Sequence, residues 1–462
     1  MRPTQWERVM RENPLLKILI SLLESLFRNE TAPTCSTLIA LTLSILYQNS
    51  CESVRGMFNH YISERTDKSL TSLYYTFDYS SININEWRIN LIELLISKLR
   101  ILKKYPIFLI VDDTLVEKYG DCFDLLAILF DHTAKNGTSY LKGHCFVSLV
   151  LVIPVLGPNG PEYIRIPVCH RMWDPDKEES KLKMAHDMML EVIEQLRAVL
   201  VNQLIACCDS WYPKAEVLEL HKEQKIPFIC AARLDTAMFN LPTAPEPGKR
   251  GRKPIYGEKL PKKDRYDDWL FKDVPGFPYQ IATREVMTTI FGHTKCTAFV
   301  TKSADGTMNL FLVTDGIDLS AFDCALIKSQ ELKALVQADR VYLPFALYKL
   351  RWHIEVVYLE LKSFWGFNAY KLRKKIGIER LINLQSIIYA LMLALPYVDE
   401  QFGCLVDCSP QERRYYLGEL LGRVTILGGF AERLERLEIN ERLVTCASWF
   451  IEAQNLSVPK AQ

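Results

Sequence analysis

Three features that would narrow the function are missing from this 462-residue sequence. It has no excess of charge of either sign, because 56 Lys and Arg against 55 Asp and Glu leave a net charge of +1. No overall field therefore favours a polyanionic partner, and any contact with nucleic acid must come from local patches. The 13 cysteines include no CxxC pair, which argues against a zinc site and indicates reduced, mostly buried thiols of a cytoplasmic protein.

Long uninterrupted apolar runs are also missing. The stretch "PLLKILISLLESLF" is broken by Lys17 and Glu24, so we expect an amphipathic helix and not a signal peptide. The most apolar run, "CFVSLVLVIPVLG", is too short to span a bilayer and contains Pro154. We therefore expect a soluble protein without membrane contact. What is present is 49% hydrophobic residues, enough for one large core or two to three domains.

The first hundred residues have helical periodicity, which predicts an N-terminal helical domain. A DNA-binding role is one interpretation of this domain. Within it, "CESVRGMFNHYISERTDKSLTSLYYTF" predicts two short helices joined by a polar turn. That pattern fits a helix-turn-helix presenting Lys68, Ser69, Thr71 and Ser72 to DNA. A plain helical bundle fits it equally well.

The pattern then changes to apolar strands alternating with helices. "YPIFLIVDDT" is a continuous apolar run ending in two acids, and "LIACCDSWYP" is a second such run ending in Asp209. Together with two further strands, two helices and a last strand, they predict a mixed α/β sheet. A segment with a basic loop, "GKRGRKPIYG", and a hairpin turn at Asp305–Gly306 follows as a β-rich insertion. The predicted divisions are 1–100, 101–235, 236–340, 341–400 and 401–462, the last being a helical tail.

The run "YKLRWHIEVVYLELK", residues 348–362, carries four polar side chains among apolar ones. At about 100° per residue, Tyr348, Arg351, Glu355 and Lys362 share an arc of roughly 60°, whereas Glu360 falls on another face. An ordinary Arg351–Glu355 pair on an exposed helix is the simplest interpretation. The apolar flanks weaken it, because a carboxylate held near a core needs a partner, a metal ion or a chemical task.

Other acids are placed to join Glu355. Asp112 or Asp113 ends the first apolar strand and Asp209 ends the later one. Strand ends of an α/β sheet lie at one edge, where sites gather. Three carboxylates there would repel one another unless cations lay between them. Mg²⁺ suits such oxygen ligands, and a pair of such ions supports phosphoryl transfer.

The spacing Tyr348-x2-Arg351-x3-Glu355-x6-Lys362 resembles the Y-R-E-K signature of DDE-type insertion-sequence transposases, the insertion sequence four family. "LIVDDT" and "CCDSWYP" resemble the strands that carry that family's first and second acids, in the family's order. The resemblance implies an α/β fold: an RNase H-like mixed-sheet catalytic core with a β-rich insertion, an N-terminal helical domain and a C-terminal helical tail.

The resemblance also implies residue roles. Asp112, Asp209 and Glu355 are expected to be catalytic and to bind metal, with Asp113 as the alternative first acid; Asp112 is favoured because it ends the apolar run directly. Two Mg²⁺ ions are the implied cofactor, with Mn²⁺ as a substitute. Tyr348, Arg351 and Lys362 are expected to bind DNA phosphates. Further DNA contacts are considered for Arg250, Arg252, Lys253 and Trp269, although a place in the core is favoured for Trp269.

The implied activity is cut-and-paste DNA transposition. A homodimer on paired ends, associated with the nucleoid in bacterial cytoplasm, would cleave double-stranded DNA at terminal inverted repeats and join the ends to target DNA. One alternative is an RNase H-like nuclease without strand transfer, and another is a transposase-derived DNA-binding protein without catalysis. A glycosidase would also use paired carboxylates, but it gives no reason for a tyrosine, an arginine and a lysine to share the arc of Glu355.

Overall fold

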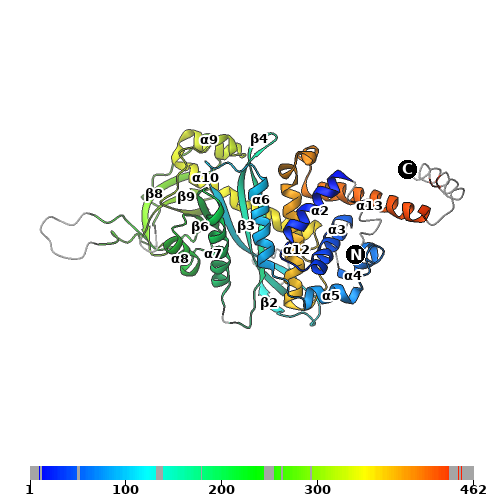
Figure 1. The fold of residues 1–462 in the computed structure, drawn as a ribbon. Coiled ribbons are helices and arrows are strands. Elements are labelled where there is room, and N and C mark those ends of the chain that lie inside the picture. The colour runs from blue at the N-terminus through cyan, green and yellow to red at the C-terminus, as the bar shows by residue number, and fades with distance from the viewer. Residues whose placement is uncertain are drawn as a thin grey trace. The chain divides into compact units, whose positions relative to one another are not determined.

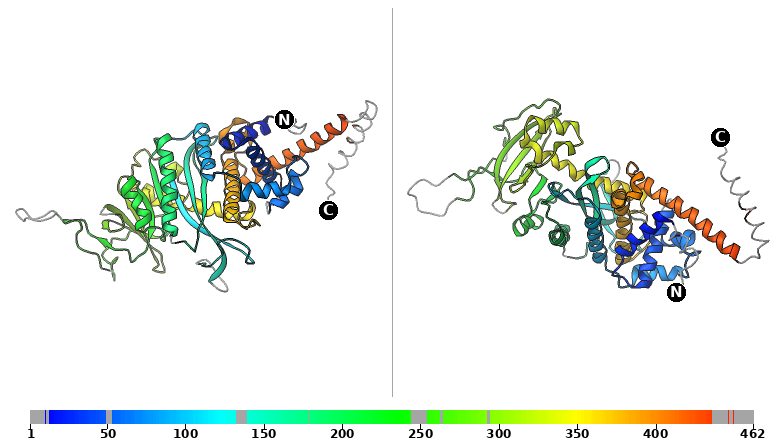
Figure 2. Two further views of the ribbon diagram at one scale, coloured as in Figure 1. Left: turned by 60° about the horizontal axis from the view of Figure 1, so that its bottom comes forward. Right: turned by 45° about the horizontal axis from the view of Figure 1, so that its top comes forward.

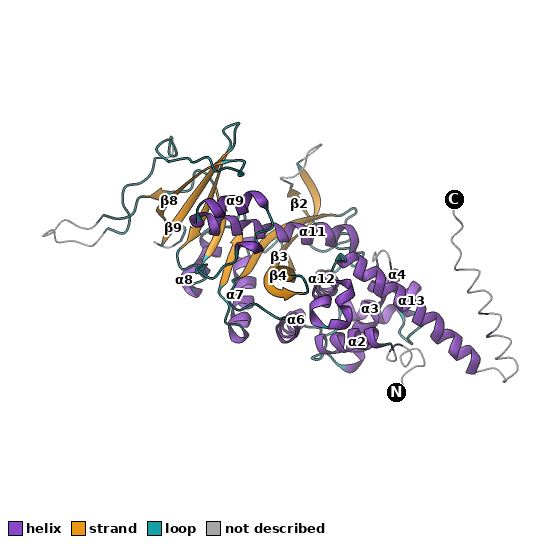
Figure 3. Cartoon of the chain, turned by 90° about the horizontal axis from the view of Figure 1, so that it is seen from above, coloured by secondary structure: helices purple, strands orange, loops and turns teal. Residues whose placement is uncertain are grey.

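The computed structural model describes residues 10, 13–48, 53–131, 139–177, 179–243, 254–261, 264–291, 294–435, 446 and 449. The chain divides into two compact units, one formed by residues 1–74 with 408–462 and the other by residues 75–407. Every described strand belongs to the second unit (Figure 3). Arg250, Arg252 and Lys253, three of the expected DNA contacts, lie outside the described residues.

The first unit is helical in its described part. Its elements are α2 (Pro14–Leu26), α3 (Ala32–Tyr47), α4 (Val54–Met57), the π-helical turn η1 (Phe58–Ile62), the start of α5 (Leu70–Asp78) and α13 (Pro410–Glu435). The side chains of Asn13 and Thr31 cap the first turns of α2 and α3. The buried Arg414 of α13 donates hydrogen bonds to the carbonyl oxygens of Ile45 and Gln48, which joins α13 to the end of α3.

The second unit is built on one ten-stranded sheet (Figure 1). Its strands are β1 (Ile107–Glu117), β2 (Ala127–Phe130), β3 (Tyr140–Gly157), β4 (Gly160–Met172), β5 (Leu204–Cys208), β6 (Phe228–Ala232), β7 (Met238–Phe239), β8 (Gln280–Thr288), β9 (Lys295–Lys302) and β10 (Met308–Thr314). β3 runs antiparallel to β1 and β4, whereas β5 is parallel to β1 and β6 is parallel to β5. This is the strand order of an RNase H-like core, so the expected fold class is confirmed. Figure 2 shows the long β3 running through the unit.

Helices cover both faces of this sheet. They are α6 (Ile84–Lys98), α7 (Lys181–Val199), α8 (Ala215–Gln224), α9 (Gln330–Ala338), α10 (Leu343–Leu347), α11 (His353–Phe364) and α12 (Lys375–Val398). On one face, Glu191 of α7 accepts hydrogen bonds from Arg171 of β4 and Arg88 of α6, each at 2.8 Å. On the other face, His170 of β4 bonds to Ser386 of α12 at 2.8 Å.

Helix α12 forms the centre of that second face. Among the described helices it alone has the length and composition to cross a membrane, and 89% of that apolar stretch is buried inside the protein, as in the core helix of a globular unit. Its long apolar run, "LINLQSIIYALMLALPY", packs against β4.

The predicted insertion continues the sheet of the second unit instead of forming a separate one. β10 pairs antiparallel with β6, and β9, β8 and β7 follow it in order. The predicted β9–β10 hairpin is present, and Gly306 takes a φ of +86° in its turn, a conformation that glycine adopts without strain. The short 3₁₀ helices η2 (Cys324–Leu326) and η3 (Arg340–Tyr342) flank α9 on the return path.

The run of residues 348–362 is not the single regular helix that its periodicity predicts. A 3₁₀ segment, η4 (Tyr348–Trp352), follows α10, and α11 begins only at His353. Because a 3₁₀ helix has about three residues per turn, side chains at i and i+3 eclipse each other. Tyr348 and Arg351 therefore still lie on one side, with the guanidinium carbon 5.8 Å from the tyrosine ring centroid.

Candidate active site

Asp112 and Asp209 come together because β1 and β5 are parallel neighbours. Val111 pairs with Cys208, so the two acids occupy the next position on each chain. β5 ends there, and the Asp209 carboxylate turns back to accept a hydrogen bond from the backbone N–H of Trp211 at 3.0 Å. The two acids thus lie side by side at the carboxyl end of the β5 strand, the edge where sites gather in α/β sheets.

Glu355 reaches the same place from α11, which packs on β1. Tyr358, one turn after Glu355, donates its hydroxyl to the main-chain carbonyl oxygen of Asp112 at 3.0 Å. Residues directly paired across strands share a face, so Asp112 and its partner Ser148 both face α11. Glu360, which the sequence places on another face, instead bonds to Arg165 of β4 at 2.7 Å.

Arg351 links two of the three acids. Its guanidinium lies 3.5 Å from the Asp112 carboxylate and also bonds to the Glu355 carboxylate. Burial, followed by the nearby charges of Asp209 and Asp113, raises the pKa of Asp112 to about 8, although Arg351 acts in the opposite direction. The acids therefore form an electrostatically strained group that a single arginine only partly neutralises.

Tyr348 and Lys362, the two other residues expected to bind DNA phosphates, have different surroundings. Tyr348 packs edge-on against Phe311, with ring centroids 5.0 Å apart, and burial raises its pKa, so its hydroxyl stays protonated and can donate. Lys362 points along β1 and donates to the Thr114 hydroxyl at 2.7 Å and the Leu115 carbonyl at 2.8 Å. Burial lowers the pKa of Lys362.

Asp113 faces away from this group. Its carboxylate accepts hydrogen bonds from Lys181 of α7 at 2.8 Å, from the thiol of Cys145 at 3.1 Å and from the hydroxyl of Tyr212 at 3.1 Å. Successive residues of a strand point to opposite faces, and here Asp112 takes the α11 face while Asp113 takes the α7 face. The geometry therefore favours Asp112 as the first acid.

Trp269 of the insertion lies largely inside the protein, with 7% of its surface exposed. Its ring meets Tyr266 edge-on at 5.4 Å, and the guanidinium of Arg284 lies 5.8 Å from its centroid. This arrangement supports the place in the core that the sequence analysis favours for Trp269.

The donor set fits a hard divalent cation, because all three acids supply carboxylate oxygens, the ligands that Mg²⁺ prefers. Within the described residues, no three His, Cys, Asp or Glu side chains lie close enough together to hold an ion as they stand. The position between Asp112 and Glu355 is held by the cationic guanidinium of Arg351. The acids thus already face a positive charge, and a metal ion bound there would take over its role.

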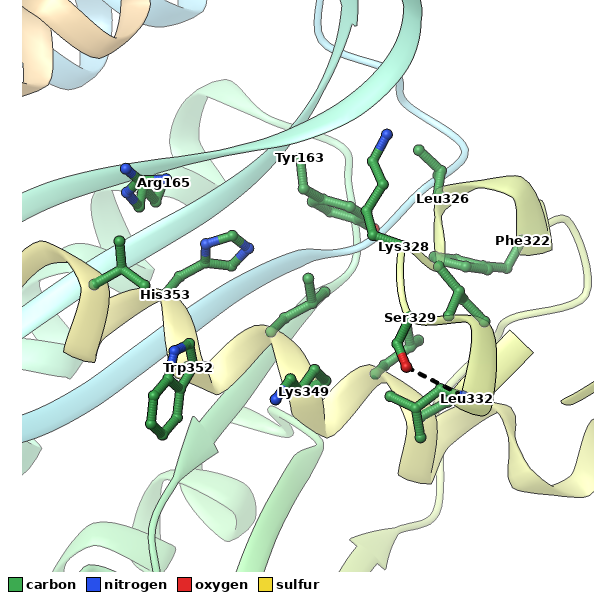
Figure 4. Close-up of a pocket in the computed structure, with 15 residues that line it drawn as sticks. Tyr163, Arg165, Phe322, Leu326, Lys328, Ser329, Leu332, Lys349, Trp352 and His353 are labelled. Carbon is green, nitrogen blue, oxygen red and sulfur yellow. Dashed lines mark hydrogen bonds between the residues drawn. The ribbon is translucent and has the colours of Figure 1, made fainter. Parts of the chain in front are cut away.

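A separate cavity of about 280 Å³ lies between β4 and the segment that carries η4 (Figure 4). Its lining is mainly apolar, and in Figure 4 Tyr163 and Arg165 lie across it from Trp352 and His353. None of the three acids lines it. The lining residues are Tyr163, Arg165, Phe322, Leu326, Ile327, Lys328, Ser329, Leu332, Ala346, Leu347, Lys349, Leu350, Trp352, His353 and Val356.

The sequence did not predict three residues that contact Asp112 or Asp113: Tyr358, Lys181 and Tyr212. Tyr358 carried a usable signal, because it follows Glu355 by three residues and so shares its side of the helix. Lys181 and Tyr212 carried none, because they meet Asp113 only through the packing of α7 and the loop after β5 against β1.

Comparison with known protein families gives two matches. A model described as a transposase DDE domain matches residues 182–391, and a model described as a DDE superfamily endonuclease matches residues 26–284, more than half of the chain. The first span includes Asp209 and Glu355, and the second includes Asp112 and Asp209.

No curated protein matches the sequence. Among solved structures, the fold is similar to a piggyBac transposase determined as a synaptic complex with hairpin DNA. The sequences are 13% identical, the alignment covers 91% of this chain and 78% of that chain, and the TM-score is 0.43.

Proposed function

This chain belongs to the DDE-type transposases, and from that premise we propose that it is a cut-and-paste transposase of the insertion sequence four family. It would cleave DNA at terminal inverted repeats and transfer the freed 3′ ends to target DNA. The Y-R-E-K spacing of Tyr348, Arg351, Glu355 and Lys362 supports the narrower family. We also propose that the protein acts as a homodimer on paired DNA ends and is associated with the nucleoid in bacterial cytoplasm.

One observation carries the catalytic part: Arg351 joins the carboxylates of Asp112 and Glu355 next to Asp209. Acids from β1 and α11 thus meet at one cationic group, and Asp209 at the end of β5 lies beside Asp112, although the three are far apart in the sequence. Placing these carboxylates close together costs free energy, because burial and mutual repulsion both disfavour their charged forms. Such a cost is expected where the carboxylates have a function.

Asp112, Asp209 and Glu355 are proposed to hold Mg²⁺, for which Mn²⁺ can substitute. Mg²⁺ bound there supplies an activated water and stabilises the leaving oxygen in phosphoryl transfer. Arg351 can turn its planar fork from the carboxylates to a DNA phosphate, and Tyr348 can donate its hydroxyl to another. Lys362 bonds to β1, so its proposed phosphate contact requires it to leave Thr114 and Leu115.

The test is cleavage of labelled DNA carrying the repeats that flank the gene, with Mg²⁺, Mn²⁺ or EDTA. Glu355→Gln should abolish metal-dependent nicking at the repeat end while DNA binding persists. Glu360→Gln is the matched control, because Glu360 lies on the same helix but pairs with Arg165. Thermal unfolding of each variant verifies that the fold is intact.

Different products separate the alternatives. Hairpin or joined DNA products indicate strand transfer, whereas nicks alone indicate a nuclease. Binding without cleavage in the wild type indicates a non-catalytic derivative, and equal cleavage by wild type and Glu355→Gln would remove the proposed triad.

A further inference from the structure

We propose that Asp113 is a positioning residue for the first two acids. Its side chain holds the loop that carries Asp209, and its main chain holds the carboxylate of Asp112. This inference rests on the proposed function, because it concerns how two of the three proposed metal-binding acids are kept in place.

The Asp113 side chain is fully engaged although 19% of its surface is exposed. One carboxylate oxygen accepts from the Tyr212 hydroxyl at 3.1 Å, and the other accepts from Lys181 at 2.8 Å and from the Cys145 thiol at 3.1 Å. Hydrogen bonds of hydroxyl or ammonium groups to a carboxylate are roughly twice as strong as neutral ones. Asp113 is therefore a rigid acceptor between α7, β3 and the loop after β5.

The bond to Tyr212 matters because of where that residue lies. Tyr212 is completely buried and stands three residues after Asp209, in the loop between β5 and α8. The same short loop is folded back by the bond from the Trp211 N–H to the Asp209 carboxylate. The loop thus has a local turn at Asp209 and an anchor on β1 at Asp113, and together these set where the Asp209 carboxylate points.

The main chain of Asp113 acts on the other acid. Its N–H donates to the Asp112 carboxylate at 2.9 Å, which fixes one of the two oxygens that face α11. Lys181 offsets the charge of Asp113 on the opposite face, so Asp113 does not compete as a third strand-borne ligand. A single residue therefore connects the two acids without reaching the site itself.

A purely structural anchor would stabilise the fold but leave metal binding unchanged. Tyr212→Phe distinguishes the two roles, because it removes only the hydroxyl and keeps the ring contact with Trp211, whose centroid lies 5.0 Å away. Tyr163→Phe is the matched control. Its half-buried hydroxyl donates to the Pro106 carbonyl at 3.1 Å, next to the opposite end of β1.

The experiment measures Mn²⁺ binding to the full-length, DNA-free protein by electron paramagnetic resonance, together with kcat and KM for cleavage of repeat-end DNA. Loss of a residue that orients metal ligands typically lowers metal affinity or activity about 10- to 100-fold. We expect Tyr212→Phe to lower Mn²⁺ affinity and kcat by such a factor with KM for DNA unchanged, and Tyr163→Phe to match the wild type. Asp113→Asn, which keeps an acceptor oxygen for Tyr212, should retain more Mn²⁺ affinity than Asp113→Ala.

Two results would overturn the inference while leaving the proposed function standing. One is a Tyr212→Phe protein that equals Tyr163→Phe in Mn²⁺ affinity and kcat, and the other is an Asp113→Asn protein no better than Asp113→Ala. A wild-type protein that neither binds Mn²⁺ nor cuts DNA would instead remove the proposed function, and this inference with it.

Discussion

Replacement of Arg351 by methionine offers a direct test of how the acids are held without metal. Arg351→Met removes the guanidinium between Asp112 and Glu355 and keeps an unbranched apolar stem of similar length. The urea-unfolding experiment is run at pH 9, above the pKa of about 8 to which burial and Asp209 raise Asp112, so that this carboxylate is ionised in the folded wild type.

The size of the effect follows from the two contacts. A hydrogen bond to a charged group contributes about 1.5–3 kcal/mol when buried. Asp112 is only 17% exposed, so its longer 3.5 Å contact contributes near the lower end of that range. Glu355 is 35% exposed, and solvent screening reduces its pair with Arg351 to about 0.5–1 kcal/mol. We therefore expect Arg351→Met to lower the free energy of unfolding in EDTA by about 2 kcal/mol.

Mg²⁺ should reverse most of this loss. A ligand that binds only the folded state adds about 2.7 kcal/mol at a hundred times its dissociation constant. At the proposed site, Mg²⁺ would have to replace the contacts of Arg351 in the wild type, whereas Arg351→Met would offer the acids without that cation. The stability deficit of Arg351→Met should thus shrink below about 1 kcal/mol in saturating Mg²⁺.

Arg165→Met is the control for this experiment. Arg165 is similarly shielded, with 20% of its side chain exposed, and pairs with Glu360 at 2.7 Å on the same helix. Its stability deficit should be the same in EDTA and in Mg²⁺. If the stability deficit of Arg351→Met is also the same in EDTA and in Mg²⁺, then Arg351 forms only structural ion pairs. The proposal that Mg²⁺ binds to these acids would then be wrong.

Three further predictions concern stability, each measured by urea unfolding. Lys362→Met should cost about 2 kcal/mol by removing two hydrogen bonds to β1, and no loss would mean that this lysine is free to bind phosphate without penalty. Arg380→Met should cost about 3 kcal/mol, because the buried guanidinium bonds to four main-chain carbonyl groups in residues 76–82; a change below about 1 kcal/mol would contradict these bonds. Trp269→Ala should cost about 3–5 kcal/mol of stability, and a selective loss of DNA affinity with unchanged stability would show that its place in the core is wrong.

Much of the sheet of the second unit could be predicted because its signals are local. The apolar runs ending in Asp112 and Asp209 predicted β1 and β5, since strands buried on both faces have short, continuous hydrophobic runs of this kind. The alternation of strands and helices up to β6 and the hairpin of the insertion were likewise readable from periodicity and turn residues.

What could not be predicted depends on contacts between distant segments. The pairing of β10 with β6 leaves no trace in the periodicity of either strand, so the insertion appeared to be separate from the core. The 3₁₀ segment at Tyr348 was hidden because i,i+3 spacing suits both helix types. The sequence favoured Asp112 over Asp113 from its place at the end of the apolar run, but the contacts of Asp113 with α7 and of Asp112 with α11 are a property of tertiary packing.

The insertion that extends the sheet also determines when, during synthesis, the three proposed acids become available together. The ribosome makes β1, β5 and their two acids first, then the entire insertion, and only afterwards α11 with Glu355. At typical elongation rates of about 5–20 residues per second, the roughly 150 residues between Asp209 and Glu355 take about 8–30 s to make. During that interval the nascent chain carries two of the three proposed acids, so we expect it to be unable to cut DNA. In a coupled transcription and translation system, chains stalled before Glu355 should therefore produce no nicks. On the proposed function, the third acid is thus added only after the whole insertion has been made.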